Sequence, residues 1–170
     1  MNTTFRVRSV QGITLIELMT TVVIIGLVAG MAAPKFERAY KRIQFRSTTR
    51  DITSTMKLAR SMAVASKDQY GIFFDPAQRT VTLFRDQVNL SNFAFESGDS
   101  TIRVDTLPTE FVYMSTDVGN NVIAFRANGS AGFTGGGNIY TMALSDDIVG
   151  IQTLNVLAST GRVHSDQWYY

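Results

Sequence analysis

The chain has 170 residues, a formal net charge of +2 and no cysteine. This length allows one ordinary domain with an extension, and a hydrophobic content of 45% excludes a wholly disordered chain. The lack of cysteine excludes disulfides, thiolate metal sites and cysteine nucleophiles. Charge is zoned: residues 35–67 carry nine bases and two acids, whereas residues 68–170 carry five bases and eleven acids. The net charge alone therefore says little about partners.

The N-terminal part of the chain has the composition of a membrane-spanning helix. Residues 1–12 are short, polar and basic, and residues 13–34 are apolar except for Glu17. A spanning helix needs about 20 mainly apolar residues, so residues 13–34 predict one transmembrane segment. Two arginines precede it, and the positive-inside rule then leaves the N-terminus in the cytoplasm and the rest of the chain on the far side.

Beyond Pro34 the pattern becomes amphipathic. Apolar residues recur at spacings of three and four, first at Phe36, Tyr40 and Ile43 and, after a shift of register, at Ile52, Met56, Ala59 and Ala63. This period predicts one helix over residues 13–66, which at 1.5 Å per residue would extend roughly 80 Å. We expect Pro34 to kink it, because proline removes a backbone hydrogen bond. We expect the stripe from Ile52 to Ala63 to pack on a sheet.

After Lys67 the helical period stops and short runs rich in β-branched and aromatic residues follow, separated by turn residues. The predicted strands are residues 70–75, 80–84, 101–105, 110–114, 121–125, 138–144 and 151–158, with a short stub at 162–164. Residues 85–100 are predicted to form a loop, and the glycines between 132 and 137 a flexible hairpin connection. Strands this close together favour antiparallel pairing. The predicted fold class is α+β: a long N-terminal helix, transmembrane in its first half, packed on an antiparallel β-sheet head.

Glu17 is the most informative single residue. It lies five residues after Gly12, inside the apolar segment. A charged side chain at the centre of a spanning helix costs roughly 2.5–3.5 kcal/mol, so this carboxylate needs a partner or a proton. No Lys, Arg or His lies within helical reach of Glu17. The partner must come from elsewhere, and the amino group of Ile13 in a neighbouring subunit would serve if the leader is removed.

The run GITLIELM at residues 12–19, followed by VVIIGLVAGMAAPKF, resembles the N-terminal signature of type IV prepilins and type II secretion pseudopilins. The resemblance implies that a prepilin peptidase in the membrane cuts between Gly12 and Ile13 and methylates the new N-terminus at Ile13. It also implies that Glu17 pairs with the N-terminal amine of an adjacent pilin or pseudopilin in a filament. Ile13 stands where the family usually has phenylalanine, and because a bulky apolar residue is kept we expect cleavage to survive.

The same resemblance implies a type IV pilin-like fold and a bacterial inner-membrane protein with a single span. Its N-terminus would be cytoplasmic, its C-terminal domain periplasmic, and its assembled form a periplasmic or surface filament. The expected parts are a leader at residues 1–12, a transmembrane half-helix at 13–34, an amphipathic half-helix at 35–66 and a β-rich periplasmic domain at 67–170.

The C-terminal runs FRANGSAGFTGGGNIYTMAL and IQTLNVLASTGRVH are similar to the end of GspH/FimT-type minor pseudopilins. The residues that carry this similarity are Phe125, Gly129, Thr160, Gly161, Arg162 and Val163. It implies a minor subunit, near the tip of a type II secretion pseudopilus or a type IV pilus, with a structural role in secretion or pilus biogenesis. The alternative is a DNA-binding minor pilin acting in DNA uptake during natural transformation.

The DNA alternative depends on Arg162 and His164. Some FimT-type proteins bind DNA through a C-terminal G-R-x-R, and in this chain the second arginine of that motif is His164. Histidine is mostly uncharged at pH 7, and lysine and arginine supply most phosphate affinity, so the departure weakens this alternative. The simpler interpretation is a strand end with a surface arginine.

Other interpretations remain open at the level of sequence. Residues 1–33 could be an ordinary signal peptide or an unprocessed signal anchor. The basic residues from 35 to 67 could bind nucleic acid or anionic lipid, or form a solvated helix face. Asp117 with Asn120, or Asp146 with Asp147, could ligate calcium, although turn capping explains them more simply.

We predict that the protein is not an enzyme and has no cofactor and no metal. It has one histidine and no zinc-ligand spacing of the H-E-x-x-H kind. No lysine follows the glycine cluster, so a phosphate-binding loop is not indicated.

Overall fold

The computed structural model of the protein describes residues 12–107, 112–145 and 148–169. Helix α1 (Leu15–Ser66) is continuous over 52 residues, which confirms the single long helix predicted from the sequence. Pro34 lies inside this helix, and a kink there stays a prediction. The chain forms two compact units, whose described parts belong to Met1–Ala39 and Tyr40–Tyr170.

The first unit contains the apolar part of α1. The helix has a window of mean hydropathy 2.2, and it is long and apolar enough to cross a membrane by length and composition. None of that window is buried inside the protein. A chain segment with this surface is stable only in an apolar environment or against other apolar helices.

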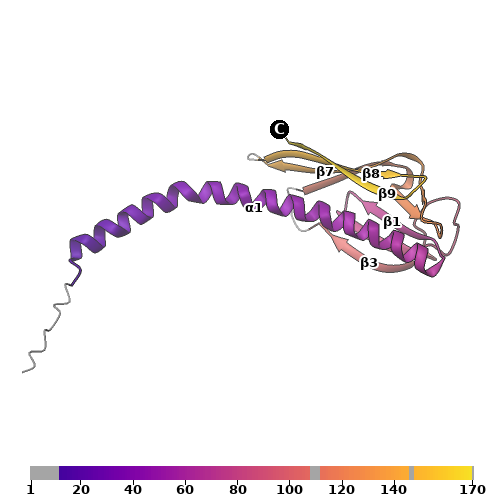
Figure 1. Cartoon of the computed structure of the whole chain (residues 1–170), viewed down its shortest axis with the longest axis horizontal. Helices are drawn as coiled ribbons and strands as arrows, with labels where there is room; N and C mark the ends of the chain where they lie inside the picture. Colours follow the sequence, from indigo (N-terminus) through magenta and orange to yellow (C-terminus); the bar gives the residue numbers. More distant parts are fainter. Residues whose placement is uncertain (1–11, 108–111, 146–147, 170) are drawn as a thin grey trace, which may run out of the picture. The chain divides into compact units, whose positions relative to one another are not determined.

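The second unit holds the remainder of α1 and two antiparallel sheets (Figure 1). The first sheet has the strand order β3-β2-β1-β5-β6, and the second has the order β4-β7-β8-β9. The strands are β1 (Tyr70–Asp75), β2 (Thr80–Arg85), β3 (Ser100–Thr106), β4 (Val112–Val118), β5 (Val122–Phe125), β6 (Ala131–Gly132), β7 (Gly135–Ser145), β8 (Ile148–Leu157) and β9 (Arg162–Tyr169). A short 3-10 turn, η1 (Gly119–Asn121), joins β4 to β5.

The predicted α+β class and antiparallel pairing are confirmed, and the strands divide into two sheets, which the sequence did not predict. Strand β1 has the predicted bounds, and the stretch from 86 to 99 is the predicted loop. Sequence reasoning missed the two-residue β6 and took β9 for a stub. It also took the glycine run for a flexible connection, whereas Gly135 begins β7 and pairs with Val118 of β4.

The main core lies where α1 packs on both sheets. Ile52, Met56, Ala59 and Ala63 are buried there, as the helical spacing predicted. They meet apolar side chains from both sheets: Ile72, Phe74, Leu83, Ile123, Phe125, Ile139, Leu154 and Val156. The earlier part of the predicted stripe lies on a different face, and Phe36, Tyr40 and Ile43 are exposed. The residue that reaches the second sheet from this part of α1 is Phe45, which packs with Val112 and Ala143.

The loop between β2 and β3 covers the outer face of the first sheet. Phe95 stacks on Phe73, with ring centroids 5.5 Å apart, and contacts Phe84 at 4.8 Å. This explains why Phe84 is fully buried although it does not belong to the core cluster that packs on the helix. Apolar residues on both faces of β2 are therefore accounted for by packing.

Candidate assembly and binding sites

The predicted cleavage site lies immediately before α1. Gly12 and Ile13 are exposed and precede the first helical residue, Leu15. The side chain of Ile13 is 73% exposed, and among the described residues nothing beyond its chain neighbours lies within 4 Å of a Cβ added at Gly12. A peptide bond that is exposed and not helical is open to a peptidase, whereas a helical bond would first have to unwind. The leader before Gly12 lies outside the described residues.

Glu17 lies in the first turn of α1. Its backbone N–H donates to the Thr14 hydroxyl at 3.3 Å, so Thr14 caps the helix. The side chain of Glu17 is exposed, and among the described residues it forms no ion pair. A carboxylate is favoured at a helix N-terminus by the partial positive charge there. In an apolar surrounding that effect is small beside the cost of an unpaired charge, so the geometry leaves Glu17 available for a partner from another chain.

A second site is formed at the other end of α1 by Arg60. Its Nε donates to the carbonyl oxygens of Gly129 at 3.0 Å and Thr160 at 3.1 Å. Gly129 and Gly161 both have positive φ angles, of 80° and 62°. A Cβ on Gly161 would lie 2.3 Å from the Gly129 carbonyl oxygen, so only glycine fits there. Residues of the predicted C-terminal motif thus surround one arginine of the helix.

The same arginine borders an open hollow of about 600 Å³. The hollow is lined by Lys57, Arg60, Thr160, Gly161, Arg162 and Val163. Lys57, Arg60 and Arg162 are exposed, so three cationic side chains from α1 and β9 share one surface. Sequence reasoning named Arg162 as a possible DNA contact and counted Lys57 and Arg60 only among the basic residues from 35 to 67, without joining them to Arg162. The spacing of three between Lys57 and Arg60 indicated that both lie on one helix face. No nearby residue indicated that β9 would lie beside that face.

His164 does not join these cations. Its Nε2 lies 3.1 Å from Asp166 Oδ1, and both side chains are more than half exposed. The two residues neutralise each other locally when the histidine is protonated, and they add no positive charge to the hollow. Of the two residues predicted as DNA contacts, Arg162 therefore lies at the cationic hollow and His164 is paired elsewhere.

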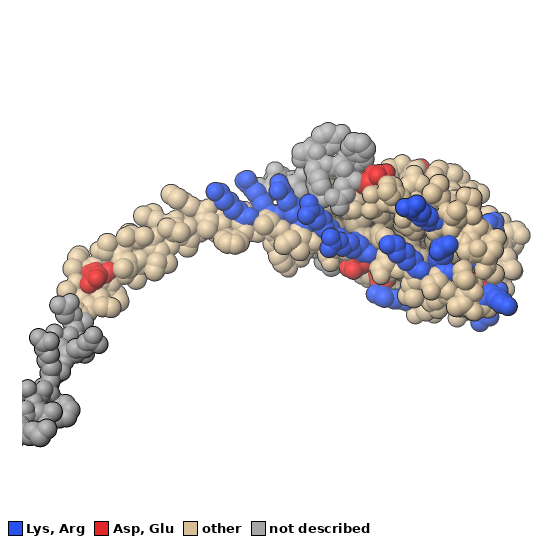
Figure 2. Space-filling model, viewed as in Figure 1, with Lys and Arg blue, Asp and Glu red and all other residues tan. Residues whose placement is uncertain are grey.

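Further basic residues extend from the hollow along the second unit's part of α1. Figure 2 shows Lys and Arg side chains in a row that follows the helix. At 100° per residue, Arg42, Arg50, Lys57 and Arg60 fall within an arc of about 80°. Arg42 and Arg60 are about 27 Å apart along the helix. These four of the nine bases in residues 35–67 therefore form one stripe of the helix surface.

The comparisons with known proteins concern first the N-terminal segment. Residues 7–33 match the prokaryotic N-terminal methylation motif. The N-terminal methylation motif predicted from the resemblance to type IV prepilins is therefore confirmed over these residues. No curated protein matches the sequence.

Two solved structures are similar to the pilin-like chain, and both are crystal structures of the type IV minor pilin FimU of Pseudomonas aeruginosa. The P21 crystal form has 13% sequence identity and a TM-score of 0.49, with 74% of this chain and 90% of that chain covered. The P65 form has 12% identity and a TM-score of 0.45, with 71% and 91% covered.

Asp117, one of the acidic candidates for calcium, forms hydrogen bonds within the second unit. Asp117 accepts hydrogen bonds from the Asn138 backbone and side-chain nitrogens, both at 2.7 Å. Partial burial raises the pKa of Asp117, but these bonds and one from Tyr140 outweigh it, so the pKa lies below its usual value. A Cβ on Gly136 would lie 2.2 Å from Asp117 Oδ2, which explains the glycine run. Asp117 of β4 is therefore bonded to β7 and does not cap a local turn, while Asp146 and Asp147 lie outside the described residues.

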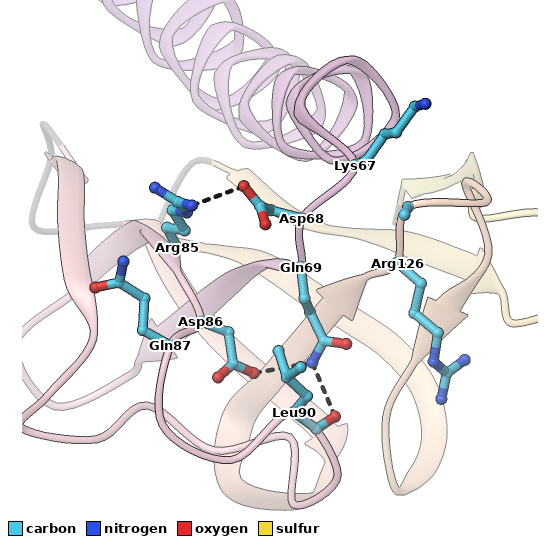
Figure 3. A pocket seen from close by; sticks show the side chains of 9 residues that line it. Lys67, Asp68, Gln69, Arg85, Asp86, Gln87, Leu90 and Arg126 are labelled. Carbon is cyan, nitrogen blue, oxygen red and sulfur yellow. Dashed lines mark hydrogen bonds and ion pairs between the residues drawn. The ribbon is translucent and has the colours of Figure 1, made fainter.

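Figure 3 shows a polar pocket at the end of α1. The Gln69 side-chain nitrogen donates to Asp86 Oδ2 at 2.8 Å and to the Leu90 carbonyl at 3.0 Å. Burial raises the pKa of Asp86, and the charges of Asp99 and Glu96 add to this against the bond from Gln69. These groups hold the loop after β2 against the start of β1. Among the described residues, no three His, Asp or Glu side chains come together to hold a metal ion.

Proposed function

We infer that this chain is a structural subunit of a filament, a minor pilin or pseudopilin of the GspH/FimT type. The observation that carries this inference is the match of residues 7–33 to the methylation motif, a range that includes Gly12, Ile13 and Glu17. An exposed peptide bond before α1 and an apolar helix with an uncovered surface support it. The host is a type II secretion pseudopilus or a type IV pilus, and the subunit belongs near its tip.

The proposed sequence of events has three steps. The chain enters the inner membrane through residues 13–34, with the leader in the cytoplasm and residues 67–170 in the periplasm. The peptidase cuts between Gly12 and Ile13 and methylates Ile13. The subunit then moves from the membrane into the filament, where Glu17 pairs with the N-terminal ammonium of a neighbour. That pairing offsets the cost of an isolated carboxylate in an apolar surrounding.

Mass spectrometry of the mature N-terminus tests the processing step. The full chain, expressed in a host with a prepilin peptidase and isolated from membranes, should begin at methylated Ile13. A chain that begins at Met1 would overturn the processing proposal in favour of a signal anchor. A chain that begins at Ala33 would indicate an ordinary signal peptide.

The hollow beside Arg60 supports a second candidate function, DNA binding in DNA uptake. Lys57, Arg60 and Arg162 line one hollow, and clustered cations are what a phosphate backbone requires. DNA binding there predicts a gel shift with the full chain in detergent, weakened by Arg162→Ala and by salt. Each phosphate contact should add about 0.9 to the slope of log K against log salt. Arg103→Ala, outside the hollow, is the control, and no shift at low salt would dismiss this function.

A further inference from the structure

Three threonines lie near the start of α1, and their hydroxyl groups bond in two different ways. Thr20 and Thr21 each donate, at 2.8 Å, to a carbonyl oxygen of the helix four and three residues earlier. Thr14 instead accepts a hydrogen bond, from the backbone N–H of Glu17 at 3.3 Å. Of these three threonines, Thr14 is therefore the one that acts as an N-cap.

The Thr14 hydroxyl bonds to an N–H group that a longer helix would use. Each N–H in an α-helix donates to the carbonyl oxygen four residues earlier, so Glu17 would bond to Ile13 if α1 began one turn sooner. With the hydroxyl as the acceptor, α1 begins at Leu15, and Gly12 and Ile13 are not helical. The Thr14 hydroxyl and the Ile13 carbonyl thus compete for one N–H group.

An apolar environment favours the longer helix in this competition. The first N–H groups of any helix have no partner within it, and in an apolar environment each unsatisfied group is costly. The most apolar window of α1 is not covered by the protein, so its first N–H groups would gain from the carbonyl groups of an earlier turn. Gly12 opposes that extension, because glycine is a poor helix former, and the Thr14 cap adds to the opposition.

We propose that Thr14 is a positioning residue for cleavage by the peptidase, an inference that rests on the proposed function. Its hydroxyl holds the start of α1 at Leu15, and the bond between Gly12 and Ile13 stays open as a result. Hydrolysis adds the hydroxyl of water to the Gly12 carbonyl carbon and a proton to the Ile13 nitrogen, and the bond between these two atoms breaks. In a helix that began one turn sooner, the Gly12 carbonyl oxygen would accept from the Ile16 N–H, and this bond would have to unwind before cleavage.

Substitutions at Thr14 separate capping from recognition of the side chain by the peptidase. Valine has the shape of threonine but no acceptor, whereas asparagine differs in shape and caps at least as well. With the full-length precursor and a prepilin peptidase in detergent, Thr14→Val should raise KM by about fivefold or more. It should leave kcat unchanged, because only a fraction of the precursor then has the open bond. Thr14→Ser and Thr14→Asn should keep KM within about twofold of the unmodified chain. Thr20→Val, which removes a hydroxyl that donates, is the matched control and should change neither constant.

An unchanged KM in Thr14→Val would overturn the proposal. A Thr14→Asn variant that is cut as poorly as Thr14→Val would also overturn it, because the peptidase would then read the threonine itself. NMR chemical shifts of Gly12 and Ile13 in the uncut precursor give a second measurement that needs no peptidase. They should become helical in Thr14→Val and not in Thr14→Asn, and unchanged shifts in Thr14→Val would refute the role of the cap. An unmodified precursor that is not cut between Gly12 and Ile13 would instead contradict the proposed function.

Discussion

Arg60 Nε lies 3.0 Å from the carbonyl oxygen of Gly129, 69 residues later in the chain, and donates a hydrogen bond to it. The same nitrogen reaches the Thr160 carbonyl at the turn between β8 and β9. One side chain of α1 therefore ties together the turns of two sheets. This contact explains the two glycines of the C-terminal motif, because a side chain at Gly129 or Gly161 would crowd the Arg60 side chain.

Removal of this contact should weaken the second unit. We expect Arg60→Ala to lower the free energy of unfolding by about 1–2 kcal/mol, because two carbonyl groups lose a charged donor at a partly exposed site. Arg60→Lys should recover little, since an ammonium group does not reproduce the planar Nε donor. Urea unfolding measures the effect. Lys57→Ala is the control, and an equal loss in that variant would contradict the account.

Gly161 should not tolerate a side chain. Its φ of 62° and the Gly129 carbonyl 2.3 Å from an added Cβ both oppose alanine. We expect Gly161→Ala to cost about 1–3 kcal/mol of unfolding free energy, because the backbone must move at both turns. Thermal unfolding checks this. Gly30→Ala, where a Cβ would meet nothing, should leave the melting temperature unchanged.

The buried carboxyl of Asp86 should make stability fall with rising pH. Burial and the charges of Asp99 and Glu96 raise its pKa above 3.8 in the folded chain. Its contribution is therefore fully present below pH 3.8 and lost as the pH rises through the folded pKa. The Asp86→Asn variant lacks this pH dependence. The stability of the variant relative to the unmodified protein should therefore increase as the pH rises from 3.8 through the folded pKa of Asp86. Urea unfolding from about pH 3.5 to pH 7 measures the difference, and a difference that shrinks with rising pH would refute the assignment.

Asp117 should make stability rise with rising pH, which is the opposite of the effect of Asp86 and is measured by the same urea unfolding. Hydrogen bonds from Asn138 and Tyr140 outweigh its partial burial and lower its pKa below 3.8. Its contribution is present above pH 3.8 and lost as the pH falls through the folded pKa. Asp117→Asn should therefore be most destabilising near neutral pH and approach the unmodified protein in acid. A deficit that persists unchanged in acid would mean that lost packing, and not lost charge, is the cause.

Glu17 is expected to act in assembly and not in folding. Glu17→Ala should leave the unfolding free energy of the second unit unchanged, because its side chain is exposed and belongs to the first unit. It should reduce recovery of the chain in sheared filaments by about tenfold or more, since the neighbour's ammonium loses its counter-charge. Immunoblots of filament and membrane fractions give the ratio. Glu17→Asp is the matched variant, and normal incorporation of Glu17→Ala would refute the pairing.

The sequence by itself predicted the features that local periodicity encodes. The apolar run after Gly12 and the spacing of Ile52, Met56, Ala59 and Ala63 are properties of neighbouring residues on one helix, so α1 and its buried stripe were predictable. Strand β1 follows in the same way from residues close in the chain. Glu17 could be singled out from the sequence, because the free-energy cost of a charged side chain in an apolar segment follows from composition alone.

Only the tertiary structure decided how distant segments meet. The division into two sheets, the approach of Arg162 to Lys57 and Arg60, and the contact of Thr49 with Thr141 join residues far apart in sequence. A strand's period determines which residues share a face, but it does not determine its partner, because several antiparallel orders bury the same faces. Phe45 was missed for that reason: its burial depends on β4 and β7 lying beneath the helix, and a helix alone does not set this.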